Sequence, residues 1–182
     1  AAENYPGYRF AASGWTDAAG NLWLFGGTTI RISLGGSDAA GLPLPHMTND
    51  IWKYDVTLGQ WMWLKGSNSA ITHTSYGVKG VPDPENLPRP RVGAVSWKDN
   101  LDNFWFMGGD SNPNVTTSGA QNDIWRYEPA RNNWTWMDGS QAPDPLPVAV
   151  EQGVPDEANA PGGRTYHSGK ADADGNLWIF GG

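Results

Sequence analysis

Three arginines stand at equivalent places in the sequence, and their side chains are the ones best suited to hold an anion. Arg9, Arg91 and Arg164 each lie 17 residues before the first glycine of a Gly-Gly pair. A guanidinium group offers a planar fork of donors that pairs with a carboxylate or a phosphate. The arginines could therefore bind a ligand, or they could serve the fold itself through hydrogen bonds. Their recurrence favours the second role, although both can hold together.

Other residue types with metal-binding or catalytic chemistry do not form a pattern. The three histidines lie in different predicted loops or strands, without metal-ligand spacing: His46, His73 and His167. Asp172-x-Asp174-Gly175 resembles the start of a calcium loop, but the downstream glutamate is absent, so we expect a polar turn. The sequence has no cysteine and no Gly-x-Ser-x-Gly motif. We therefore expect no metal, no cofactor and no catalytic residue in this chain.

Composition and charge narrow the class of protein. The chain has 24 glycines, 14 prolines and 11 tryptophans among its 182 residues, which is typical of an all-β protein of short strands and many turns. The formal net charge is −7, and the 12 basic residues are scattered. A nucleic-acid partner is not expected, because no basic stripe could track a phosphate backbone. No apolar run is long enough to cross a bilayer.

An internal repeat shows which elements must position these side chains. The segment from Arg91 to Gly109 matches the segment from Arg164 to Gly182 at an offset of 73 residues, which the block 49–54 shares with the block 122–127. The first arginine spacing is 82 residues, and the extra nine residues lie within 28–48.

Each repeat is predicted to form four strands, which are 9–16, 21–25, 51–55 and 60–64 in the first repeat. We name them A to D in this order. Strand B is apolar on both sides, as in Leu22-Trp23-Leu24-Phe25. A strand of this kind needs cover on both faces of its sheet. Sheets stacked around an axis satisfy that need, because each sheet packs against two neighbours.

These blocks resemble the kelch repeat. In that family an arginine enters the inner strand, an apolar strand ends in Gly-Gly, and a tryptophan follows a tyrosine by seven residues. Tyr54 and Trp61 show this spacing, as do Tyr127 and Trp134. The resemblance implies an all-β fold, a partial β-propeller with two complete four-stranded kelch blades and the first half of a third. The repeats would span 4–85, 86–158 and 159–182.

The number of blades predicts that other blades complete the ring. A propeller closes with about 4–8 blades, so we expect the remaining blades to come from a longer chain. The end blades would then expose faces and edges that a closed ring covers. Open sheet edges recruit other strands, so we expect this segment alone to be marginally stable or to aggregate.

The tryptophans invite a carbohydrate-binding interpretation, because indole rings stack on sugar faces. However, all 11 lie on predicted strands, and nearly all recur with the repeat. Residues that recur with the repeat serve what recurs, which is packing within and between blades. We therefore expect the tryptophans, including Trp63 and Trp136, to be buried packing residues.

The predicted connections place binding on one face. The A–B and C–D turns are short and share one face, whereas the long connections share the other: 28–48, 110–121, 65–90 and 138–163. Long loops on a rigid scaffold are where binding usually resides, although they could instead only shield the blade ends. Polar or aromatic, non-repeating residues near strand ends supply five candidates, which are Arg31, Tyr76, Lys79, Asp110 and Asn112. We add the three arginines at the mouth of the channel, which are Arg9, Arg91 and Arg164.

The sequence therefore predicts a binding module with a protein or carbohydrate partner on the long-loop face. The loops resemble those of bacterial secreted kelch proteins, which implies an extracellular or cell-surface location, with the periplasm as an alternative. Two other functions stay open. Resemblance to sialic acid mutarotases implies a propeller enzyme that acts on carbohydrate, with arginines in its channel. The third possibility is a structural surface or filament protein.

Overall fold

The computed structural model describes residues 4–30, 45–67, 73–112 and 118–182. Within these ranges the chain forms thirteen β-strands and no helix. It follows that these ranges contain no helix long and apolar enough to span a membrane. All strand pairs are antiparallel.

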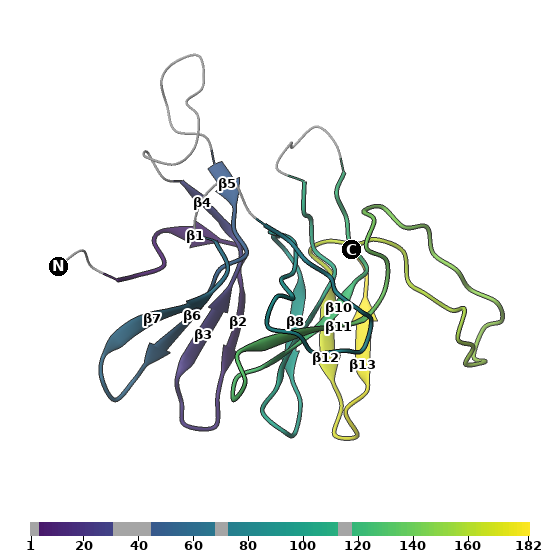
Figure 1. Ribbon diagram of the computed structural model, residues 1–182. Coiled ribbons are helices and arrows are strands. Elements are labelled where there is room, and N and C mark those ends of the chain that lie inside the picture. The colour runs from purple at the N-terminus through teal and green to yellow at the C-terminus, as the bar shows by residue number, and fades with distance from the viewer. Residues whose placement is uncertain (1–3, 31–44, 68–72, 113–117) are drawn as a thin grey trace, which may run out of the picture.

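The strands form successive blades that fan out side by side (Figure 1). The first blade contains β2 (Ser13–Thr16), β3 (Leu22–Phe25), β6 (Ile51–Asp55) and β7 (Gln60–Lys65), hydrogen-bonded in that order. The second contains β8 (Val95–Lys98), β9 (Phe104–Met107), β10 (Ile124–Glu128) and β11 (Asn133–Asp138). The third has only β12 (Ser168–Ala171) and β13 (Leu177–Phe180). The predicted grouping of four, four and two strands, and with it the partial propeller, is confirmed.

The first repeat departs from the prediction above its blade. Strand A does not run unbroken from Arg9, because Ala11 adopts a left-handed conformation with φ of 54°. The residues before this break form β1 (Arg9–Phe10), which joins β4 (Thr28–Ile30) and β5 (Pro45–Met47) in a small separate sheet. The prediction of a plain loop over 28–48 was therefore wrong at its two ends, where the extra length of this repeat allows additional strands.

The blades meet along their innermost strands, since β2 contacts β8 and β8 contacts β12. Backbone hydrogen bonds tie each blade to the next: the N–H of Gly27 donates to the carbonyl of Arg91 at 2.9 Å, and that of Gly109 to Arg164 at 2.9 Å. A Cβ on Gly109 would lie 2.7 Å from the carbonyl oxygen of Val92. The second glycine of the pair is therefore required by close approach as well as by its φ of 91°.

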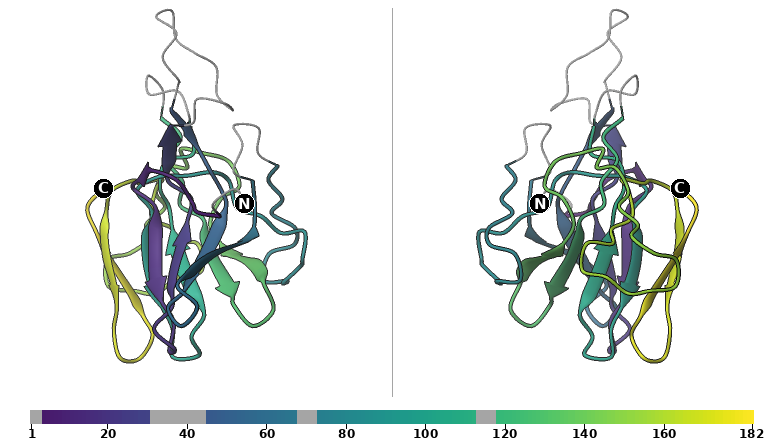
Figure 2. Two further views of the ribbon diagram at one scale, coloured as in Figure 1. Left: turned by 90° about the vertical axis from the view of Figure 1, so that its left-hand side faces the viewer. Right: turned by 90° about the vertical axis from the view of Figure 1, so that its right-hand side faces the viewer.

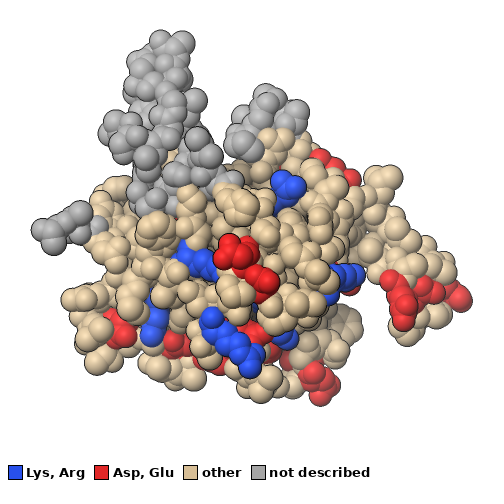
Figure 3. Space-filling model, in the orientation of Figure 1, with Lys and Arg blue, Asp and Glu red and all other residues tan. Residues whose placement is uncertain are grey.

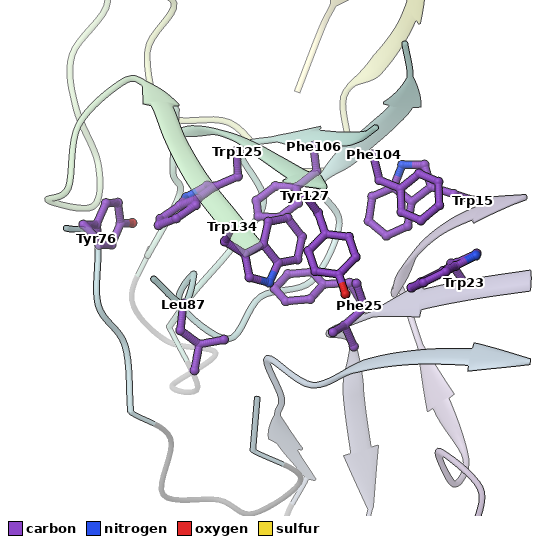
Figure 4. Close-up of a cluster of buried hydrophobic side chains, with 11 residues drawn as sticks. Trp15, Trp23, Phe25, Tyr76, Leu87, Phe104, Phe106, Trp125, Tyr127 and Trp134 are labelled. Atoms are coloured by element: carbon purple, nitrogen blue, oxygen red, sulfur yellow. The ribbon is translucent and has the colours of Figure 1, made fainter. Parts of the chain in front are cut away.

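Aromatic side chains fill the space between the first two blades (Figure 4). Phe25 of β3 stacks on Phe106 of β9 with ring centroids 5.1 Å apart, and Trp15 stacks on Phe104 at 5.3 Å. Trp134 of β11 is fully buried. The doubly apolar strand B thus faces a neighbouring blade, as its sequence pattern predicted.

The A–B hairpin turns are closed by one carboxylate each. Asp99 accepts hydrogen bonds from the backbone N–H groups of Leu101 and Asn103, and from the side chains of Asn103 and Trp105, all at 2.8–2.9 Å. Asp17 and Asp172 make the corresponding bonds in their own blades. The interpretation of the Asp172 region as a polar turn is confirmed.

These bonds lower the pKa of the aspartates. Burial raises the pKa of Asp99, but the hydrogen bonds from Asn103 and Trp105 outweigh that effect, so the pKa lies below its ordinary value. The carboxyl of Asp172 is exposed, and the donors on Trp178 and Asn176 lower its pKa to about 2.

Candidate functional site

The two ends of the blades differ in the length of their connections. The short turns at 17–20, 56–59 and 99–102 lie together at one end of the molecule, whereas the long connections leave from the other end (Figure 1). The second end, which we call the long-loop face, is the one on which the sequence places a binding site.

The arginines at the start of strand A do not line an open channel. Arg9 donates to both carboxylate oxygens of Asp50, at 2.8 and 3.0 Å, and to the carbonyl of Gly26 at 2.8 Å. The exposed fraction of the two charged side chains is only 5% for Arg9 and 0% for Asp50. The expectation that a ligand could reach this guanidinium was therefore wrong, because an aspartate just before strand C occupies its donors.

Arg91 repeats this arrangement in the second blade. Its donors contact Asp123 at 2.6 and 2.7 Å and the carbonyl of Gly108 at 2.8 Å. Burial lowers the pKa of Arg91, but the adjacent charge of Asp123 raises it further, so the group stays charged inside the fold. Arg91 is likewise closed to a ligand, and it holds the entry to strand C within its own blade.

Arg164 lacks such a partner in the part of the chain that the structure describes. Its Nη1 donates to the carbonyl of Gly181 at 2.9 Å, as its equivalents do to Gly26 and Gly108. However, no described carboxylate forms an ion pair with it. Only the third of the three arginines could therefore still accept an anionic group.

Tyr76 is a core residue, and the prediction of an exposed aromatic anchor was wrong. Its side chain is 8% exposed, and its hydroxyl donates to Asp123 at 2.6 Å. Its ring packs edge-on against Trp125 and Trp136, with centroids 4.9 and 5.5 Å away (Figure 4). Burial, together with the negative charge of Asp123, raises the pKa of the phenol well above its usual value.

Lys79 lies in the same D–A connection, at the outer edge of the second blade. It pairs with Asp138, and its ammonium nitrogen is 6.0 Å from the ring centroid of Trp136. The neighbouring Gly80 donates its N–H to the carbonyl of Trp136 at 2.8 Å. This connection therefore folds back over β11, which is the shielding role that the sequence left open for the long loops.

Asp110 and Asn112 do lie on the long-loop face. Asp110 pairs through its backbone with Val92 and Ala120, and its carboxylate accepts the N–H of Asn112 at 2.8 Å. Both side chains are partly exposed. The remaining candidate, Arg31, lies outside the described residues.

Sequence reasoning missed Tyr166, which occupies the rim of the innermost strands. It is equivalent to Ala11 and Gly93, and all three have positive φ, at 52°, 54° and 65°. The N–H of Gly93 donates to the carbonyl of Ala11 at 3.0 Å, and that of Tyr166 to the carbonyl of Gly93 at 2.8 Å. Tyr166 is nevertheless 65% exposed. A tyrosine at the position where the second repeat has glycine was the signal that could have revealed it.

Charge and metal chemistry give no second site within the described ranges. Acidic side chains gather on the loop that projects at the right of Figure 3, which carries exposed Glu151, Asp156 and Glu157. His167 is nearly buried beside Arg164, and burial together with that positive charge lowers its pKa. No group of three or more described His, Asp or Glu residues is arranged to hold a metal ion.

Comparison with known proteins gives a structural likeness only. No protein-family model matches the chain, and no curated protein matches it by sequence. One solved structure that resembles it is titled "Structure of YjhT", with a TM-score of 0.44 and 16% sequence identity. The likeness covers 73% of this chain and 38% of that one, so the chain spans well under half the length of that structure.

Proposed function

We propose that this chain is part of a kelch-type β-propeller that serves as an extracellular or cell-surface binding module. Its partner, a protein or a carbohydrate, docks on the long-loop face. The kelch assignment rests on the recurring blocks of sequence, and the structure adds blades that follow the same period.

The observation that carries this proposal is the exposed Tyr166. A non-glycine residue with positive φ stores backbone strain, and such strain often marks a functional site. The side chain gains no burial in return, since it is 65% exposed. An exposed tyrosine ring is also a common anchor in binding surfaces, because it is large, rigid and amphipathic.

Asp110 and Asn112 belong to the same proposed surface. Gly109, which directly precedes Asp110, donates its N–H to the carbonyl of Arg164 at 2.9 Å, two residues before Tyr166. The aromatic ring and the polar pair therefore arise from neighbouring segments of two adjacent blades. Arg31 would extend this surface from the first repeat.

The opposite face is less suited to a partner. Its A–B turns use their conserved geometry internally, because Asp17, Asp99 and Asp172 accept hydrogen bonds from their own hairpins. The enzymatic alternative also loses support, since Arg9 and Arg91 are buried in ion pairs.

The test begins with a panel of immobilised saccharides and extracellular proteins, to which the purified chain is applied. Each probe that binds is then measured with Tyr166→Gly and with Leu58→Ala, a control in an exposed turn of the opposite face. We expect Tyr166→Gly to weaken binding about fivefold or more, which corresponds to about 1 kcal/mol. The proposal fails if Leu58→Ala weakens binding and Tyr166→Gly does not.

A further inference from the structure

We propose that β13 and the segment 148–160 form a docking site for an antiparallel β-hairpin. The inner strand of this hairpin would begin Asn-Asp-x-Trp, and its outer strand would carry Trp-x-Trp, as β10 and β11 do. This surface is separate from the proposed long-loop site.

The second blade shows how such a hairpin is held. There the segment 75–87 lies against β11: the side-chain amide of Asn86 donates to the carbonyl of Trp134 at 3.0 Å, and Gly80 donates to that of Trp136 at 2.8 Å. Asp83 also bridges to Trp134. The contact recurs in the first blade, where Asn4 donates to the carbonyl of Trp61 at 2.8 Å.

The segment 148–160 already has the fold of 75–87. The two segments are 73 residues apart, and the bridge between Val148 and Ala160 reproduces the one between Ser75 and Leu87. The backbone bonds inside the segments also correspond. A preformed site lowers the conformational cost of binding.

Asn159 is positioned in the same way as its equivalent, Asn86. Its side-chain amide donates to the carbonyl of Val154 at 3.1 Å, as that of Asn86 does to Val81 at 3.0 Å. However, Asn86 makes its second bond to the outer strand and is 1% exposed, whereas Asn159 is exposed and has no described outer strand to contact. Gly153, the equivalent of Gly80, is exposed as well.

The inner part of the same site is open along β13. This strand pairs only with β12 among the described strands, so its other edge presents unpaired backbone groups. Trp178 and Phe180 on β13 are 68% and 84% exposed, whereas Met107, the equivalent of Phe180 on β9, is 2% exposed. In Figure 2 the β12–β13 hairpin lies at one margin of the molecule.

Arg164 specifies the chemistry of the inner strand. Arg9 and Arg91 each pair with an aspartate that immediately precedes strand C. Arg164 keeps the carbonyl contact of its equivalents but faces no described carboxylate. An incoming strand that begins with Asn-Asp would supply this charge while its backbone pairs with β13.

The experiment appends a copy of residues 110–140 directly after Gly182, which is equivalent to Gly109. The copy carries the hairpin in its natural register, and the tether gives it a high effective concentration. A control chain carries the same residues in shuffled order. Hydrogen exchange of the β13 amides and of 148–160 should slow at least tenfold in the extended chain, and Trp178 fluorescence should shift to shorter wavelength.

A variant separates docking from a general effect of the extension. Asp123→Asn, introduced only in the appended copy, should restore faster exchange in β13 without altering the resident chain. Equal exchange in the extended and shuffled chains would overturn the proposal. It would also be overturned if the original chain sediments as a dimer with β13 already protected, because a second copy would then be the occupant.

Discussion

Arg91 donates two hydrogen bonds to Asp123, at 2.6 and 2.7 Å, inside the second blade, where neither side chain is more than 1% exposed. The same carboxylate also accepts the hydroxyl of Tyr76 at 2.6 Å and the indole N–H of Trp125 at 2.7 Å. One aspartate thus joins the start of strand A, the start of strand C and the D–A connection. A single buried charge organises three segments that are distant in sequence.

Removal of this charge should destabilise the blade strongly. Asp123→Asn leaves the guanidinium of Arg91 buried without its counter-charge, and breaking a buried ion pair in this way costs about 3–5 kcal/mol. The free energy of unfolding in urea measures the loss. Arg164→Ala provides a matched control at the third equivalent position, where the structure describes no carboxylate partner. A loss at Arg164 as large as that at Asp123 would contradict this account.

Tyr76 should behave as a core residue. Tyr76→Phe keeps the ring between Trp125 and Trp136 but removes the hydroxyl that donates to Asp123. A hydrogen bond to a charged acceptor contributes about 1.5–3 kcal/mol, so thermal unfolding should occur at a lower temperature. An unchanged melting temperature would show that the hydroxyl does not stabilise the fold.

The tryptophans of the outer strands should differ sharply in their contributions. Trp134 is completely buried, so Trp134→Ala should cost about 3–5 kcal/mol. Trp63 is 47% exposed, which corrects the expectation that it is buried, and Trp63→Ala should cost about 1–2 kcal/mol. Urea unfolding of the two variants tests the difference, and equal losses would show that exposure does not determine these contributions.

Stability should fall in acid through the hairpin-turn aspartates. Hydrogen bonds hold the pKa of Asp99 below its model value of 3.8, so its stabilising contribution is complete above that pH and is lost as the pH falls through the lower pKa of the folded state. Asp99→Asn should be less stable at neutral pH and should show a shallower loss of stability below about pH 4. Unfolding curves measured between neutral pH and acid give both slopes, and parallel slopes would argue against this role.

The sequence predicted the blades well because their signals are periodic. Strand B is apolar on both sides, the Gly-Gly pairs recur, and both features require the neighbouring blade that the structure shows. The Asp172 turn was also readable, since hairpin-turn chemistry is local.

The site was less predictable because it depends on contacts between distant segments. Nothing in the spacing of Arg91 and Asp123 shows that they meet, so the arginines were expected to face a channel. Tyr76 looked exposed because it lies in a long connection, yet that connection folds over β11. Tyr166 was overlooked because its backbone strain arises from hydrogen bonds between blades.

The most direct test of the binding proposal is a hydrogen-exchange footprint, measured with whichever saccharide or protein of the panel gives the strongest response. The account predicts slower exchange around 110–112 and 164–167, on the long-loop face. Slower exchange confined to the turns around Ala18, Gly20 and Gly59, on the opposite face, would contradict it.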